Sequence, residues 1–155
     1  MNLKNLVSRV NPARRVSEAE AHCDGPCGVY DPASARIAAE AVRSMTKKLL
    51  DLHEHDGDAP AIMLNTAARY VAIKEEQAEL AKREILILWT DFFKPDHLEA
   101  HPDLHTTFWN AAKLCSMCKQ NVDLDACDQL IAAIENIHKM FWGAKGRDVD
   151  FYLAG

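Results

Sequence analysis

Apolar residues recur every three or four positions along most of the chain, a spacing that predicts α-helices. The first such pattern begins after residue 32, and its apolar members share one side of the predicted helix: Ala38, Ala41, Met45, Leu49 and Leu52. Asp31 and Pro32 precede it, as a capping side chain followed by proline typically precedes a helix. We therefore expect a first helix that ends near Leu52.

A second and longer helix is expected to open at Pro60 and to end near Phe93. Its length would be roughly 50 Å at about 1.5 Å per residue. The charged middle, residues 74–83, indicates a solvent-exposed face. Residues 85–89 are apolar all round, which favours burial against another subunit as well as against the core of the same chain.

Two further helices complete the pattern, one starting at Pro102 and one capped by Asp123. Their apolar stripes also step by three and four: Leu104, Phe108, Ala111, Cys115 and Cys118, then Cys127, Ile131, Ile134, His138 and Phe141. Short connections between helices favour antiparallel neighbours. No strand pattern is visible, so the predicted fold class is all-α, an up-down antiparallel four-helix bundle.

Composition and charge narrow the functional classes. The chain has 155 residues, 48% of them hydrophobic, enough for one domain with its own core. A net charge of −5 argues against a nucleic-acid partner, which needs a clustered basic face. No apolar run approaches the ~20 residues that span a bilayer, so no membrane partner is expected. Residues 1–21 lack the continuous apolar region of an export signal, which predicts a cytoplasmic protein.

The five cysteines fall into two groups. Their odd number in an apparently intracellular chain argues against a disulfide framework. Cys115, Cys118 and Cys127 lie on apolar helical stripes, where free cysteine behaves as a small buried hydrophobe. The other two flank the turn-forming pair Gly25-Pro26, within the segment HCDGPCGVYDP at residues 22–32.

This segment concentrates the candidate chemistry. The turn brings the thiols of Cys23 and Cys27 to one side, and thiolates combined with nitrogen donors favour nickel or copper rather than tetrahedral zinc. Residues 19–21 are a short small-residue stretch that a protease could cut. Cleavage there would give His22 a free α-amine, whose reference pKa is about 7.7–8.0. This amine and the amide nitrogen of Cys23 could then chelate one metal ion.

The segment closely resembles the metal-binding hook of the nickel superoxide dismutases. The resemblance extends over most of the chain, through five further matching segments: residues 35–37, 73–75, 78–82, 89–95 and 141–142. It implies that residues 1–21 are a propeptide removed by a processing protease. The mature domain would then be residues 22–155, with a hook at 22–30 and a bundle at 31–155.

The resemblance also implies a ligand set and an activity. Cys23 and Cys27 would provide thiolates, Cys23 its backbone nitrogen, and His22 its amine and an axial imidazole that is bound in the oxidised state. Asp24 and Tyr30 would shape the pocket. One nickel ion per subunit, in a homohexamer, would cycle between Ni(III) and Ni(II) and dismute superoxide to dioxygen and hydrogen peroxide.

Three positions depart from the family pattern. Ala38 and Gln77 replace a glutamate and an arginine that support the axial imidazole in other members, and Phe92 replaces a tyrosine of some relatives. A partner that orients a metal ligand typically changes affinity or activity by about 10–100-fold. The departures therefore bear on how the His22 ring is supported, and not on the metal ligands themselves.

Two other functions are compatible with the residues. A non-catalytic nickel or copper carrier could use the same hook. Alternatively, a helical interaction module could hold Cys23 and Cys27 in a disulfide or on structural zinc. The carrier would leave superoxide decay unchanged, and the module would work with residues 1–21 attached, whereas the enzyme requires their removal.

Overall fold

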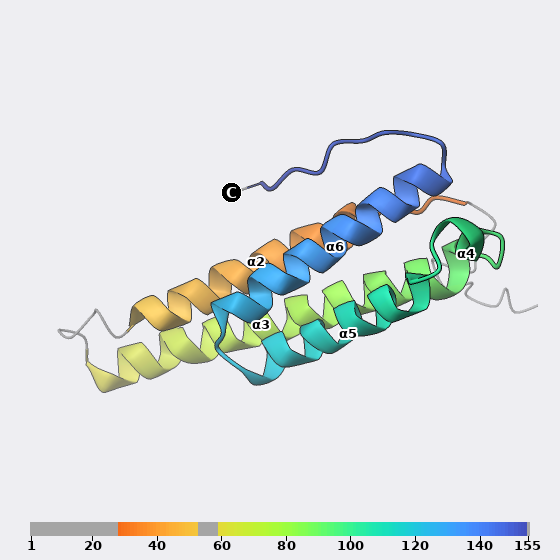
Figure 1. The fold of residues 1–155 in the computed structure, drawn as a ribbon. Helices are drawn as coiled ribbons and strands as arrows, with labels where there is room; N and C mark the ends of the chain where they lie inside the picture. Colours follow the sequence, from red (N-terminus) through yellow and green to blue (C-terminus); the bar gives the residue numbers. More distant parts are fainter. Residues whose placement is uncertain (1–27, 53–58, 155) are drawn as a thin grey trace, which may run out of the picture.

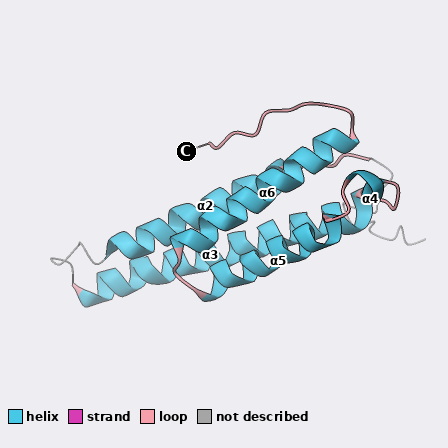
Figure 2. Ribbon diagram, in the orientation of Figure 1, coloured by secondary structure: helices cyan, strands magenta, loops and turns pink. Residues whose placement is uncertain are grey.

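The protein was analysed as a computed structural model, which describes residues 28–52 and 59–154 (Figure 1). Within these ranges the secondary structure is helical, without strands (Figure 2). The elements are α2 (Ala33–Asp51), α3 (Pro60–Ile87), the π-helical turn η2 (Leu88–Phe92), α4 (His97–Ala100), α5 (Leu104–Gln120) and α6 (Leu124–Ala144). The predicted all-α class is confirmed.

The four long helices run side by side and alternate in direction along the chain (Figure 1). Helix α2 packs on α3 and α6, and α5 packs on the same two helices. Each long helix thus has two neighbours, as in an up-down antiparallel four-helix bundle, and this part of the prediction is also confirmed.

The predicted stripes of α5 and α6 form the core. Every apolar position assigned to them is buried, and Phe108, Leu130, Ile134 and Phe141 are among the largest fully buried side chains. The Asp123 carboxylate caps α6, because its Oδ1 atom accepts hydrogen bonds from the backbone N–H groups of Asp125 and Ala126 at 2.9 and 3.2 Å. Sequence periodicity therefore located both helices and the faces that they bury.

The buried face of α2 differs from the predicted stripe. Ala38 is buried as expected, but Ala41, Met45 and Leu49 are only partly buried. The core side of α2 instead consists of Ala35, Ala38, Ala39, Val42 and Thr46. The reason is that α2 lies between α3 and α6, so its core face is rotated by about one residue from the stripe that apolar residues alone define.

The charged middle of α3 is not the fully solvent-exposed face that was predicted. Lys74, Ala78 and Ala81 are buried there. The Lys74 ammonium group donates hydrogen bonds to three backbone carbonyls at the end of α5, those of Cys118, Lys119 and Asn121, at 2.5, 2.7 and 3.1 Å. The last carbonyls of a helix lack partners within the helix. Lys74 therefore caps α5 from a neighbouring helix.

Replacing Lys74 by Met is expected to lower the free energy of unfolding by about 2–3 kcal/mol, since hydrogen bonds from charged donors contribute roughly 1.5–3 kcal/mol. Methionine keeps the apolar stem but leaves the α5 carbonyls without their donor. Urea denaturation of the variant measures this loss. Lys139→Met is the control, because this side chain is 66% exposed and pairs only with Glu135 on its own helix; its effect should stay below about 1 kcal/mol.

After α6 the chain leaves the bundle and returns along its surface (Figure 1). His138 Nε2 lies 2.7 Å from the Val149 carbonyl oxygen, and the Ala154 N–H donates to Glu40 Oε2 at 2.7 Å. The Arg36 guanidinium carbon lies 4.5 Å from the centre of the Tyr152 ring. Residues 145–154 thus fasten α6 to α2, a contact that no sequence pattern had indicated.

Candidate metal centre

Most of the predicted metal centre lies outside the described residues. His22, Cys23, Asp24 and Cys27 belong to that part of the chain, whereas Tyr30 is described. The described part of the hook starts at Gly28, whose φ of 64° lies in the left-handed region. A residue with a Cβ atom is strained in this conformation, so glycine suits the position where the hook turns towards the bundle.

The exit from the hook is fixed by local contacts. Asp31 Oδ1 accepts a hydrogen bond from the Ala33 N–H at 2.8 Å, and the Pro32 carbonyl accepts from the Arg36 N–H at 3.2 Å. Pro32 is fully buried. The predicted helix start is therefore correct to within a residue, and it holds the end of the hook at the end of the bundle.

Tyr30 lies against an aromatic cluster built from the ends of η2 and α6. Its ring centre is 5.7 Å from that of Phe92 in η2. Phe92 in turn lies 4.4 Å from Phe141 of α6 and 4.9 Å from Phe93. Aromatic pairs at such separations contribute stability beyond the area that they bury. The cluster therefore positions Tyr30, the last residue of the hook.

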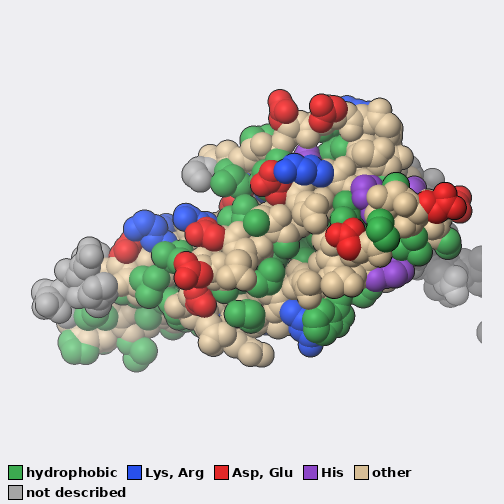
Figure 3. Space-filling model, viewed as in Figure 1, with side chains coloured by type: hydrophobic (Ala, Val, Ile, Leu, Met, Phe, Trp, Pro, Cys, Tyr) green, Lys and Arg blue, Asp and Glu red, His purple; other side chains and the backbone are tan. Residues whose placement is uncertain are grey.

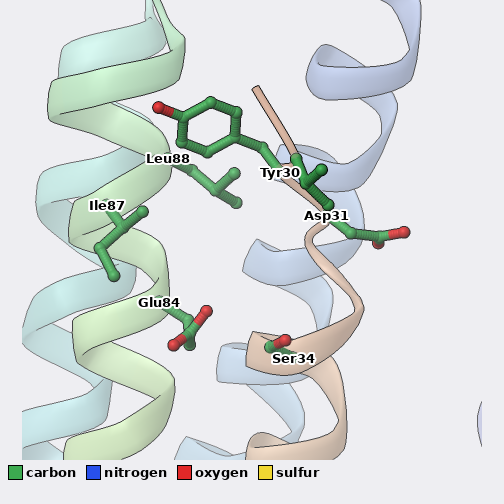
Figure 4. Close-up of a pocket in the computed structure, with 7 residues that line it drawn as sticks. Tyr30, Asp31, Ser34, Glu84, Ile87 and Leu88 are labelled. Atoms are coloured by element: carbon green, nitrogen blue, oxygen red, sulfur yellow. The ribbon is translucent and has the colours of Figure 1, made fainter. Parts of the chain in front are cut away.

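A small pocket adjoins this end of the hook, with Val29, Tyr30 and Asp31 along one wall. Its other residues come from the start of α2 and from the end of the second long helix: Ser34, Glu84, Ile87 and Leu88. In Figure 4 the Glu84 side chain extends from α3 into the gap between the two helices. The pocket thus carries a carboxylate close to the hook, which the sequence analysis had not singled out.

The structure also shows what surrounds Ala38, Gln77 and Phe92, the three residues that depart from the family pattern. The Ala38 side chain is completely buried, Gln77 is partly buried, and Phe92 is the partner of Tyr30. None of the three carries a charge. Any charged support for the hook must therefore come from other positions, and Asp31 and Glu84 are the acidic residues that line the adjoining pocket.

Positive charge gathers at the same end of the bundle. The Lys145 ammonium nitrogen lies 4.8 Å from the Phe141 ring centre and 5.7 Å from that of Phe92. Arg147 stacks on Trp142 at 4.7 Å. Cations over aromatic faces are stabilised there. Lys94, two residues beyond the end of η2, is also exposed.

The remaining metal-ligand candidates have structural roles. Cys115, Cys118 and Cys127 are buried, as predicted. His97 lies in the short helix α4, and its Nδ1 accepts from the Lys94 N–H at 3.0 Å. His105 Nδ1 accepts from Trp89 Nε1 at 2.8 Å. Among the described residues, no group of three or more His, Cys, Asp or Glu side chains is placed to hold a metal ion.

Comparison with known families decides the classification. The sequence model described as nickel-containing superoxide dismutase matches residues 17–145, a range that includes the whole hook and the four-helix bundle. The chain belongs to the nickel-containing superoxide dismutase family. Residues 146–154, which fasten α6 to α2, lie beyond the matched range.

Individual members of the nickel superoxide dismutase family align over most of their length. The superoxide dismutase [Ni] of Streptomyces seoulensis is 41% identical over 131 residues, which cover 83% of this chain and 91% of the relative. That of Streptomyces coelicolor is also 41% identical, over 125 residues covering 81% of this chain and 88% of the relative.

Solved structures of nickel superoxide dismutase share the fold. The crystal structure described as the oxidised state superposes with a TM-score of 0.71 at 41% identity, covering 81% of this chain and all of that one. A native structure gives the same TM-score and coverage at 40% identity. The resemblance carried by the hook and the helical segments is therefore confirmed at the level of family and fold.

Proposed function

We propose that this chain is a nickel-dependent superoxide dismutase, which converts two superoxide ions into dioxygen and hydrogen peroxide. The observation that carries the proposal is the family match, because it runs without a break through the cysteine-containing hook and the bundle. A match to the helices alone would identify a scaffold, on which function can differ.

The proposed ligands are His22, Cys23 and Cys27, which would hold one nickel ion per chain. Their donor atoms fit the metal, since soft thiolates together with nitrogen donors suit nickel better than magnesium or calcium. When bound, nickel supplies one-electron chemistry by cycling between Ni(III) and Ni(II). The thiolates donate electron density to the metal, which brings its potential into the range that superoxide chemistry needs.

The described residues would position the hook and attract the substrate. We propose that Tyr30, held against Phe92, shapes the approach to the metal together with Asp24. Lys145 and Lys94 place positive charge at this end of a chain whose net charge is −5. Local positive charge raises the encounter rate of an anionic substrate even when the whole protein is negative.

The proposal also covers the processing of the precursor and its location in the cell. Residues 1–21 would be a propeptide, and a protease would release the α-amine of His22 by cutting after Ala21. The mature protein would act in the cytoplasm. No helix in the described part of the chain is long and apolar enough to span a membrane.

We also propose that the mature chain forms a homohexamer. Large apolar side chains that a lone subunit would leave in water support self-association: Val29, Ile62, Leu64 and Trp109 are 67, 55, 72 and 54% exposed. Figure 3 shows apolar side chains reaching the surface at several places, including the end where α3 begins. Apolar side chains that gather on the surface, as they do at that end, are typical of protein interfaces. Light scattering of the processed protein measures the number of chains in the assembly.

The alternative, a nickel or copper carrier, makes an opposite prediction. The processed, nickel-loaded protein is expected to accelerate superoxide decay in pulse radiolysis and to retain its metal against a competing chelator during the assay. The nickel-free protein serves as the control. A protein that exchanges nickel freely and leaves superoxide decay unchanged would be the carrier.

A further inference from the structure

Two of the buried thiols face each other across the hairpin of α5 and α6. Cys118 lies in the last turn of α5 and Cys127 in the first turn of α6, so they flank the connecting residues 121–123. In an antiparallel hairpin such positions are opposite one another. Both thiols are buried in the contact between α5 and α6, and each perturbs the pKa of the other. Cys115 lies one helical turn further from the connection.

The surroundings distinguish Cys127 from the other two thiols. Its Sγ lies 3.5 Å from Thr46 Oγ1 on α2, a hydroxyl that can rotate and donate to a thiolate. The contact with Cys118, and then that with Thr46, lower the pKa of Cys127 below its ordinary value, although burial acts in the opposite direction. Of the charged groups nearby, the Asp128 carboxylate raises the pKa of Cys127, and the Lys74 ammonium group, held at the Cys118 carbonyl, lowers it by less.

The neighbouring cysteines are held as thiols. Burial raises the pKa of Cys115 to about 12. The contact with Cys127, together with burial, raises the pKa of Cys118. Since the thiolate is the reactive form and Cys127 is the thiol of the pair whose Sγ contacts the Thr46 hydroxyl, Cys127 is the expected nucleophile and Cys118 the group that reacts second.

We propose that Cys118 and Cys127 are a peroxide-oxidised pair that closes to a reversible disulfide. The Cys127 thiolate attacks one oxygen of hydrogen peroxide, the O–O bond breaks, and a sulfenic acid and hydroxide form. Cys118 sulfur then attacks the sulfenic sulfur and expels its oxygen as hydroxide. The two thiol protons convert both hydroxides to water. Two thiols thus lose two electrons, and one peroxide gains them.

The position of the pair favours this outcome over irreversible damage. The thiols are buried and Lys74 caps the end of α5, so peroxide reaches them when the connection between α5 and α6 opens locally. A resolving thiol in contact stops oxidation at a disulfide that cellular thiols can reverse, whereas further oxidation to the sulfinic acid cannot generally be reversed. That the protein itself produces the peroxide rests on the proposed function, whereas the disulfide chemistry requires only that peroxide be present.

The test adds hydrogen peroxide in equimolar amount to the processed chain and to a chain carrying Cys23→Ser and Cys27→Ser. The second chain excludes the hook thiols as relays, and it needs no nickel or activity. After alkylation and trypsin digestion, the expected product is peptide 114–119 joined to peptide 120–139, short of two hydrogen atoms. A thiol reductant should separate the two peptides again.

Peptide 114–119 contains two cysteines, Cys115 and Cys118, so single replacements are needed to identify which of them is joined to Cys127. Cys115→Ala is the matched control and should form the linked peptides to the same extent as the parent chain, whereas Cys118→Ala and Cys127→Ala should each lose them completely. A link that persists in Cys118→Ala but disappears in Cys115→Ala would overturn the assignment. Failure of the parent chain to form the link, or sulfinic acid as the main product at Cys127, would overturn the proposal.

Discussion

Replacing either Cys23 or Cys27 by Ser is expected to reduce nickel binding from one ion per chain to none and to lower superoxide dismutation by more than about 100-fold. Loss of a group that merely orients a metal ligand typically costs about 10–100-fold, and loss of a direct ligand should exceed that. A serine hydroxyl is a hard, neutral donor that does not replace a thiolate. Metal analysis of the purified variants measures the first effect, and pulse radiolysis measures the second.

Cys115→Ser is the matched control for this prediction. Cys115 is fully buried among apolar side chains at the middle of α5, so its replacement puts a hydroxyl where no water reaches it. Stability should fall by about 1–3 kcal/mol while nickel content and activity per folded chain stay unchanged. Normal nickel stoichiometry in Cys23→Ser and Cys27→Ser would mean that the thiols of the hook are not the ligands.

The helical parts of the fold could be predicted because they follow from local periodicity. The stripes of α5 and α6 and the cap at Asp123 come from residue spacing alone, and they occur where expected. The buried face of α2 and the burial of Lys74 could not be predicted, since they depend on which helix lies opposite. A lysine in a charged run looks solvent-exposed until the end of α5 is placed beside it.

The candidate site also has one part that the sequence predicts and one part that it does not. The hook is recognisable because its ligands are close together in sequence, and the family match covers it. Glu84 and Lys145 are distant from the hook in sequence and carry no motif, so only the fold brings them to its end of the bundle. The packing of residues 145–154 onto α2 is likewise a tertiary contact. Polar and apolar residues alternate in this segment over too few positions to predict a helix or a strand.

A chain that retains residues 1–21 is expected to be inactive, and removal of these residues is expected to restore full activity. In the unprocessed chain the nitrogen of His22 belongs to a peptide bond, so it is an amide like that of Cys23 and the amine that the ligand set requires is missing. After cleavage the α-amine has a reference pKa of about 7.7–8.0, so a metal can displace its proton near neutral pH. A specific protease site placed directly before His22 allows both forms to be made from one preparation.

This prediction depends on the exact residue at which the processed chain begins. A chain that starts at His22 should bind one nickel ion and dismute superoxide, whereas a chain that starts one residue earlier, at Ala21, should behave like the precursor. The two differ by a single alanine, so folding and assembly are matched and only the chemical state of the His22 nitrogen changes. Intact-mass analysis of the active protein identifies its first residue. Activity in a chain whose His22 is still joined to Ala21 would exclude the amine as a ligand and would favour a side-chain-only site, as in the carrier or zinc alternatives.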